Sequence, residues 1–178
     1  LEVSAAIAER LRPCEAELAR LDTIPGVGQR TAEILLAELG TDLSRFPSAA
    51  HLASWAGMCP GNHESAGKRY SGKTRKGNPY VRRALVEAAQ AAGHTKETYL
   101  AAQYQRLASR RGRKRAAVAV GHSILVRAYY LLQRGTSYEE PGGQYFDERQ
   151  RHTVTHRLVE RLERLGYQVT LQPIDPAA

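Results

Sequence analysis

One serine lies among glycines and cations in the stretch 60–68, which reads Pro-Gly-Asn-His-Glu-Ser-Ala-Gly-Lys. A serine hydroxyl is a useful nucleophile only when its proton is removed or the charge formed in the reaction is stabilised. Lys68 and the cations after it supply positive charge that would stabilise a pentavalent phosphorus. These residues leave two roles open for Ser65: nucleophile toward a phosphodiester, or hydrogen-bond partner of a phosphate or of its own turn. Ser71 lies among the same cations and is a rival.

Other chemistries find less support in the sequence. No acidic residues cluster at the spacing of a two-metal nuclease site. Two pairs at four-residue spacing have no further zinc ligands nearby, Cys59/His63 and His152/His156. The order Gly-x-x-x-x-Gly-Lys-Thr at 67–74 satisfies the nucleotide-binding loop pattern, but no buried strand precedes it, so we interpret it as a coincidence. We therefore expect neither a metal site nor a cofactor in this chain.

Positive charge is concentrated in two stretches of the chain. The 178 residues include 26 Lys and Arg against 18 Asp and Glu, a net charge of +8. The stretches 63–83 and 106–115 hold half of the cations and a single acid, which favours a polyanionic partner over a merely solvated basic face. We predict that the following residues of these stretches contact nucleic acid: Lys68, Arg69, Lys73, Arg75, Lys76, Asn78, Arg82, Arg83, Arg110, Arg111, Arg113, Lys114 and Arg115.

A further candidate contact is the turn 24–28, Ile-Pro-Gly-Val-Gly, which precedes a helical pattern through Leu39. The segment 21–40 resembles the helix-hairpin-helix motif of DNA-binding proteins. Because glycine has no Cβ atom, the backbone N–H groups of Gly26, Val27 and Gly28 can approach a phosphate at a helix N-terminus. Such a contact positions a duplex without reading its bases. The alternative is a helical corner whose glycines are purely structural.

The first 20 residues have the rhythm of a coiled-coil seam. Apolar side chains follow one another at spacings of four and three residues, at Ile7, Leu11, Cys14, Leu18 and Leu21. Pro13 should interrupt the helix between two seam positions. Residues 1–20 are therefore either the end of a coiled-coil-like arm that could dimerise, or an amphipathic helix on the domain's own core. We take residues 1–20 as the arm and 21–178 as one domain.

Nearly all other periodicity in the chain is helical. We predict five further helices, over 48–56, 78–92, 95–107, 114–133 and 151–165. Ser48, Asn78 and Thr95 are the expected N-caps of the first three. The remaining segments are an irregular, glycine-rich basic loop at 57–77, a turn-rich segment at 135–145 and at most one short strand at 167–171. The predicted fold class is an all-α, helix-hairpin-helix-containing domain with an N-terminal helical arm.

The sequence also bears on compartment. No apolar run approaches the roughly 18–20 residues of a membrane-spanning helix, and the beginning lacks the order of a signal peptide. Two cysteines are too few for a disulfide scaffold. We expect a bacterial cytoplasmic protein that acts on the nucleoid and has no membrane partner. The chain begins at Leu1, so an upstream piece is expected to be missing.

Three runs carry a resemblance to a known family: 52–60 (Leu-Ala-Ser-Trp-Ala-Gly-Met-Cys-Pro), 65–68 (Ser-Ala-Gly-Lys) and 75–85 (Arg-Lys-Gly-Asn-x-x-Val-Arg-Arg-Ala-Leu). They resemble the C-terminal domain of the bridge-RNA-guided insertion-sequence recombinases, which are related to Piv-type DNA invertases. The helix-hairpin-helix pattern and the tail 145–171 fit the same family. The resemblance therefore covers most of the chain from Leu21 onward.

The resemblance implies that a serine at the position of Ser65 attacks the DNA backbone and becomes covalently attached, with Ser71 as rival. It also implies a homo-oligomeric parent protein with a coiled-coil arm, a guide (bridge) RNA and an N-terminal RuvC-like domain whose acidic residues bind Mg²⁺. This chain lacks that acidic tetrad, so we expect a fragment that is inactive alone. Ala66 departs from the family, in which a second glycine is common. The alternative function is a non-catalytic helix-hairpin-helix module that binds nucleic acid.

Overall fold

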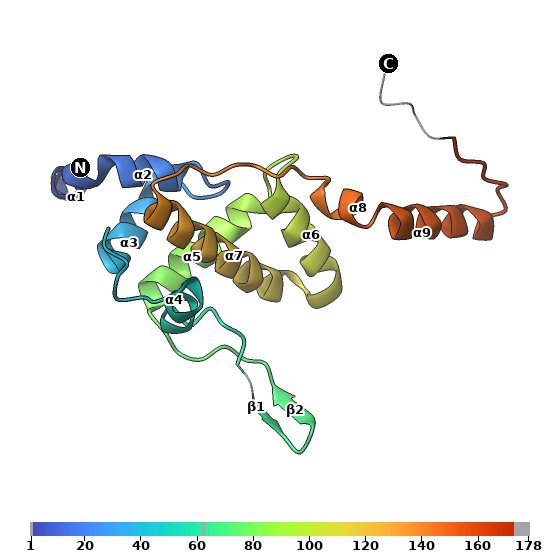
Figure 1. The fold of residues 1–178 in the computed structure, drawn as a ribbon, viewed down its shortest axis with the longest axis horizontal. Coiled ribbons are helices and arrows are strands. Elements are labelled where there is room, and N and C mark those ends of the chain that lie inside the picture. Colours follow the sequence, from blue (N-terminus) through green and yellow to red (C-terminus); the bar gives the residue numbers. More distant parts are fainter. Residues whose placement is uncertain (1, 62, 173–178) are drawn as a thin grey trace. The chain divides into compact units, whose positions relative to one another are not determined.

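A computed structural model describes residues 2–61 and 63–172 and divides the chain into two compact units, Leu1–Gly143 and Gln144–Ala178. Figure 1 shows the elements in chain order. The first unit contains α1 (Glu2–Leu11), a 3₁₀ helix η1 (Arg12–Cys14), α2 (Glu15–Asp22), α3 (Gln29–Leu39), α4 (Ala49–Trp55), β1 (His63–Ser65), β2 (Lys68–Ser71), α5 (Pro79–Ala92), α6 (Tyr99–Arg111) and α7 (Arg113–Arg134). The second contains α8 (Tyr145–Arg149) and α9 (Arg151–Arg164). The all-α fold class is confirmed.

Helix α7 is the centre of the first unit, because α2, α4, α5 and α6 all pack against it. Its buried stripe is rich in small residues, which lets neighbouring helices approach closely. At Gly121 a Cβ atom would lie only 2.8 Å from Cε of Met58 and 3.0 Å from the carbonyl oxygen of Leu85. The crossing of α7 over α5 and the end of α4 therefore depends on a residue without a side chain.

The N-terminal seam packs partly on the domain's own core. Pro13 lies in η1, so the predicted interruption of the helix is confirmed. Leu11, Cys14 and Leu18 are half-buried against the core, and Leu21 is fully buried. For this part of the seam, the contacts agree with the alternative of an amphipathic helix that packs on the domain's own core. Dimerisation through the arm stays a prediction.

Two segments differ from their predicted structure. The segment 57–77, predicted to be an irregular loop, contains the antiparallel hairpin of β1 and β2. The segment 167–171, predicted to form at most a short strand, has no regular structure. Both differences have one cause, since a strand is stable only with a paired neighbour. The hairpin supplies its own partner across a tight turn, whereas 167–171 has no second strand within the described residues.

The start of α6 also differs from the prediction. Its N-cap is Thr98, whose hydroxyl accepts a hydrogen bond from the backbone N–H of Ala101 at 3.2 Å, rather than Thr95. The Thr95 hydroxyl instead donates to the carbonyl of Ala92 at 2.7 Å and so closes the end of α5. Ser48 and Asn78 are N-caps, as predicted. Within the described residues, no helix combines the length and apolar character needed to cross a bilayer.

Candidate nucleic-acid interface

Ser65 lies at the tip of an exposed β-hairpin. In the register of the two strands Ser65 is opposite Lys68, and the turn between them consists of Ala66 and Gly67. Both turn residues have positive φ, +50° and +73°, the signature of a two-residue type I′ turn. Ser65, the turn residues and Lys68 are all exposed. Side chains directly opposite in an antiparallel pair share a face, so the side chains of Ser65 and Lys68 project from the same face of the hairpin.

Ser71 occupies a different place on the same hairpin. It ends β2 at the far end of the ladder, opposite His63. Its hydroxyl accepts a hydrogen bond from the backbone N–H of Lys73 at 3.1 Å, so it already serves a local turn. It is exposed like Ser65. The structure therefore places the two serines at opposite ends of the ladder, Ser65 at the tip and Ser71 toward the body.

The two legs that carry the hairpin touch each other below the strands. A Cβ atom on Gly77 would lie 2.2 Å from the backbone nitrogen of Gly57. A Cβ atom on Gly61 would lie 2.2 Å from the carbonyl oxygen of Lys73. Real Cβ atoms do not approach other atoms this closely, so only glycine fits at these positions. The segment 57–77 is therefore a two-legged ribbon that projects from the helices, as Figure 1 shows.

The Arg82 guanidinium fastens both legs to α5. Its Nη1 atom donates hydrogen bonds to the carbonyl oxygen of Gly57 in the first leg and to the Thr74 hydroxyl in the second, the latter at 2.9 Å. The side chain is half-buried. Arg82 was predicted to contact nucleic acid, but this nitrogen is already used within the fold. Its basic neighbour Arg83 is exposed instead.

Asn78 has a structural role as well. Its Oδ1 accepts hydrogen bonds from the backbone N–H groups of Tyr80 and Val81 at 2.9 and 3.0 Å, which caps α5. Its Nδ2 donates to Oε2 of Glu38 on α3 at 2.6 Å. Both ends of the side chain therefore hold α5 in place, and little remains for a phosphate.

Other predicted contacts on this ribbon face solvent. Lys68, Lys73, Arg75 and Lys76 are exposed. The Arg69 side chain lies outside the described part of the structure. Since the only acid that the sequence places in this stretch is Glu64, the exposed face of the ribbon is strongly cationic.

The second basic stretch forms the corner between α6 and α7. The corner turns at Gly112, which has φ of +82°. Its exposed cations flank this glycine on both sides: Arg110, Arg111, Arg113, Lys114 and Arg115. The last three occupy the first turn of α7, which holds no acid and has no side-chain cap. Because the helix dipole is positive at this end, these cations add to a potential that attracts anions.

The turn 24–28 contains two glycines with different surroundings. Gly26 has φ of +86°, and a Cβ atom there would lie 2.3 Å from the carbonyl oxygen of Ala88 and 2.5 Å from the nitrogen of Ala92. Gly26 therefore packs against α5, and Val27 is buried with 4% exposure. Gly28 is exposed, precedes α3 and has open space around it. Of the three predicted contacts, Gly28 has the accessible position.

The packing of Gly26 agrees with the alternative that the glycines of this turn are structural, and the sequence holds a signal for it. Small residues recur on the face of α5 that receives the turn, at Ala84, Ala88 and Ala92. Such spacing allows a backbone to approach a helix closely. Similarly, the repeated glycines at 57, 61 and 77 indicated close approach between the two legs, which an unpaired loop would not need.

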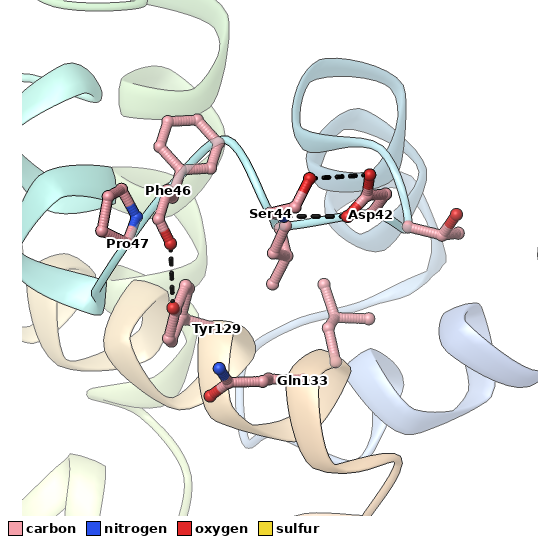
Figure 2. A pocket seen from close by; sticks show the side chains of 9 residues that line it. Asp42, Ser44, Phe46, Pro47, Tyr129 and Gln133 are labelled. Carbon is pink, nitrogen blue, oxygen red and sulfur yellow. Dashed lines mark hydrogen bonds between the residues drawn. The ribbon is translucent and has the colours of Figure 1, made fainter.

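A cavity of about 420 Å³ lies elsewhere in the first unit, between the loop 41–47 and the end of α7. Figure 2 shows the Tyr129 hydroxyl bonded to the Phe46 carbonyl at 3.0 Å at one side of it. At the other side, the backbone N–H and the hydroxyl of Ser44 both bond to Asp42 and lower the pKa of its carboxyl group. None of the predicted site residues lines this cavity.

Metal ligands are sparse in the described part of the chain, residues 2–61 and 63–172. Among these, no three or more His, Cys, Asp or Glu side chains come together in a group able to hold a metal ion. The acid-poor hairpin offers none of the carboxylate clusters that Mg²⁺ requires. The described residues of this chain therefore do not fit a magnesium site.

The fold and the site define an all-α domain with a projecting basic hairpin, and known proteins are similar to this chain in sequence. Residues 18–105 match the family described as "Transposase IS116/IS110/IS902 family". This stretch includes the turn 24–28, the whole ribbon and α5. Residues 18–105 are therefore similar to the transposase domain of this family.

Individual relatives agree with this result. The chain is 34% identical over 130 residues to a protein of Sinorhizobium fredii named as a transposase, covering 70% of this chain and 33% of that protein. It is 36% identical over 125 residues to a protein of insertion element IS110 from Streptomyces coelicolor, covering 67% and 29%. A pilin gene-inverting protein of Moraxella bovis is 53% identical over 45 residues, 25% and 14% of the two chains. The chain thus spans about a third of the length of the first two relatives.

Proposed function

We propose that this chain is the DNA-binding, serine-bearing domain of a transposase or recombinase, with Ser65 as the nucleophile. The observation that carries the proposal is the position of Ser65. It is exposed at the tip of a cationic ribbon, opposite Lys68, inside the segment that matches the transposase family. A nucleophile that must reach a phosphorus in a DNA backbone needs such a projecting position.

The reaction that this geometry suits is a phosphoryl transfer. Oγ of Ser65 attacks a backbone phosphorus, a bond between that oxygen and phosphorus forms, and the bond from phosphorus to one strand oxygen breaks. The proton lost by the serine is balanced by the proton gained by the leaving oxygen. Lys68 beside the hydroxyl stabilises the negative charge on the pentavalent phosphorus. The phosphoserine ester keeps the energy of the original diester, so the reverse step rejoins a strand without ATP.

Further parts of the proposal come from the family resemblance. As the resemblance implies, Mg²⁺ would be held by a RuvC-like domain outside this chain. A guide RNA would select the DNA, and the parent protein would act as an oligomer. The chain by itself is accordingly expected to bind DNA without cleaving it.

The test uses the longer parent protein that contains this domain. Wild type, Ser65→Ala and Ser71→Ala are incubated with substrate DNA and then denatured, and covalent protein–DNA adducts are measured. We expect adducts in wild type and Ser71→Ala and none in Ser65→Ala, with DNA binding retained in all three. Adducts that persist in Ser65→Ala and vanish in Ser71→Ala would move the nucleophile to Ser71.

A second candidate function is a binding module without chemistry of its own. It is favoured by the corner at Gly112 and the exposed turn at Gly28, since neither needs a serine to hold a phosphate. This function predicts DNA binding by all three proteins and no adduct in any of them, including wild type. The adduct experiment therefore separates the two functions.

A further inference from the structure

We infer that the ribbon and the α6–α7 corner form one surface that binds a single DNA duplex. The inference rests on the proposed function and adds to it the arrangement of the bound DNA. The two basic stretches are separated in sequence, and the alternative is that each binds its own duplex. Three observations place them on a common path.

The first observation is the direction in which the chain runs along α7. The Tyr129 hydroxyl in the second half of α7 bonds to the Phe46 carbonyl at 3.0 Å. Gly121, eight residues earlier in α7, lies against Met58. The segment 46–58 therefore follows α7 toward its N-terminus. Because the ribbon leaves the body directly after Met58, it starts on the side of the molecule toward which the first turn of α7 points.

The second observation is the separation of the two stretches. Arg113 is eight residues from Gly121, which corresponds to about 12 Å along a helix. Gly121 touches Met58, and the preceding residue, Gly57, is where the two legs of the ribbon meet. The base of the ribbon and the corner are thus about 12 Å apart along α7, roughly a third of the 34 Å turn of a duplex. In Figure 1 the hairpin extends at the bottom of the first unit, and the turn between α6 and α7 lies at the right of its helices.

The third observation is the absence of acids from the segments that form the corner and lead into the ribbon. No Asp or Glu occurs from residue 98 to 138, which includes α6, the corner and α7, or from 43 to 63, which leads into the ribbon. No carboxylate in these segments interrupts the path with a repulsive charge toward phosphate. Exposed cations lie at both of its ends, Lys68, Lys73, Arg75 and Lys76 on the ribbon and the five cations around Gly112 at the corner.

These observations favour duplex DNA over smaller anions. A phosphate or an acidic peptide would be satisfied by one cluster, whereas a duplex presents regularly spaced charges over the whole distance. Each cluster alone would bind a few phosphates. Both together would act on one ligand, so that removal of either weakens the same binding event.

The experiment measures binding of this chain to a 20-base-pair duplex by fluorescence anisotropy over a range of salt concentrations, with stoichiometry from a titration at high protein concentration. The ribbon variant changes Lys68, Lys73 and Lys76 to Ala, and the corner variant changes Arg110, Arg111 and Arg113 to Ala. A control variant removes the same charge from α9, at Arg157, Arg161 and Arg164. Thermal unfolding followed by circular dichroism verifies that all variants fold.

We expect one duplex per chain in wild type. Each variant should lower the slope of log affinity against log salt by up to about three, since each phosphate that is no longer neutralised lowers it by roughly 0.9. The variant with both sets changed should lose most of the salt dependence, and the α9 control should retain more affinity than either single-cluster variant. Hydroxyl-radical footprints should show the two variants losing protection at positions a few base pairs apart on one duplex.

Two results would overturn the inference in distinguishable ways. Two duplexes per chain, or a cluster whose removal leaves affinity and salt slope unchanged, would show separate sites while the proposed DNA-binding function stands. Wild type that fails to bind duplex DNA would overturn the shared surface and the proposed function together.

Discussion

The turn at 24–28 and the ribbon at 57–77 are both rich in glycine, and both are predicted to meet nucleic acid, yet their glycines do different things. Gly26 is pressed against α5, where a Cβ atom would lie 2.3 Å from a backbone oxygen. Gly67 at the hairpin tip has open space around it. The first glycine is needed for tertiary packing and the second only for the local turn.

The difference shows that two separate conditions can require glycine at a position. One is backbone conformation, which both glycines satisfy with positive φ. The other is space, which only Gly26 lacks. Within the ribbon the same contrast recurs, since Gly57, Gly61 and Gly77 lack space in the legs while the tip is open.

The largest expected effect on stability comes from a substitution in the packed turn 24–28. Gly26→Ala should lower the free energy of unfolding by about 3 kcal/mol or more, because a Cβ atom would collide with backbone atoms of α5 in a left-handed conformation. Chemical denaturation measures this. The matched control is Gly28→Ala, where no atom lies within 4 Å, and it should change stability far less. Equal losses in the two variants would contradict the packing role of Gly26.

The next effect concerns the attachment of the ribbon to α5. Arg82→Ala should cost about 1–3 kcal/mol locally, because it leaves the Gly57 carbonyl and the Thr74 hydroxyl without their charged donor. Amide hydrogen exchange in 57–77 should speed up by about 5- to 100-fold while α7 keeps its protection. Arg83→Ala removes the same charge from the adjacent exposed position and should leave exchange unchanged. If the amides of 57–77 stayed protected from exchange in Arg82→Ala, the two legs would not depend on the Arg82 hydrogen bonds.

A smaller effect is expected at the cap of α5. Asn78→Ala should lower stability by about 1 kcal/mol because two backbone N–H groups lose their acceptor. Asn78→Asp keeps an acceptor oxygen but replaces the amide that donates to Glu38 with a second carboxylate. At neutral pH that variant should be less stable than wild type because the two carboxylates repel each other. Adding Glu38→Gln removes one of these charges and should restore the stability. Thermal unfolding of the single and double variants measures the coupling, and its absence would contradict the Asn78–Glu38 contact.

The smallest effect is expected at the hairpin tip, where the turn residues Ala66 and Gly67 are exposed. Ala66→Gly should stabilise the hairpin by no more than about 1 kcal/mol, because alanine at φ of +50° carries a strain that glycine lacks, offset in part by greater freedom in the unfolded chain. Gly67→Ala should shift stability the opposite way by a similar amount. NMR amide chemical shifts and exchange rates of β1 and β2 report both changes. A large loss in Gly67→Ala would show that the tip is packed after all.

Local signals account for much of what was predicted correctly. Helical periodicity placed α3, α4, α5, α7 and α9, and capping residues such as Ser48 and Asn78 set where two of these begin. Pro13 marked an interruption that its missing N–H imposes in any context. The exposed positions of Lys68 and of the Gly112 corner also follow from charge, since isolated cations are costly to bury.

The predictions that needed correction depended on partners distant in sequence. Whether 57–77 forms a ribbon depends on two legs meeting at Gly57 and Gly77, and whether 167–171 forms a strand depends on a neighbour that the described residues do not supply. Arg82 and Arg83 are the same residue type, but their side chains leave α5 in different directions. Arg82 bonds within the fold, and Arg83 is exposed to solvent.

The amino-acid sequence by itself determined the all-α class, the helix boundaries near their caps, the two concentrations of positive charge and the likeness of the serine-bearing motif to a recombinase family. These are properties of neighbouring residues and need no knowledge of the rest of the chain. Only the tertiary structure decided that Ser65 stands at the tip of a paired hairpin, that Gly26 packs against α5, that Arg82 holds both legs of the ribbon, and that Gly121 of α7 lies against Met58. The hairpin depends on the pairing of two strands and the other contacts on residues far apart in sequence, which periodicity and composition do not encode.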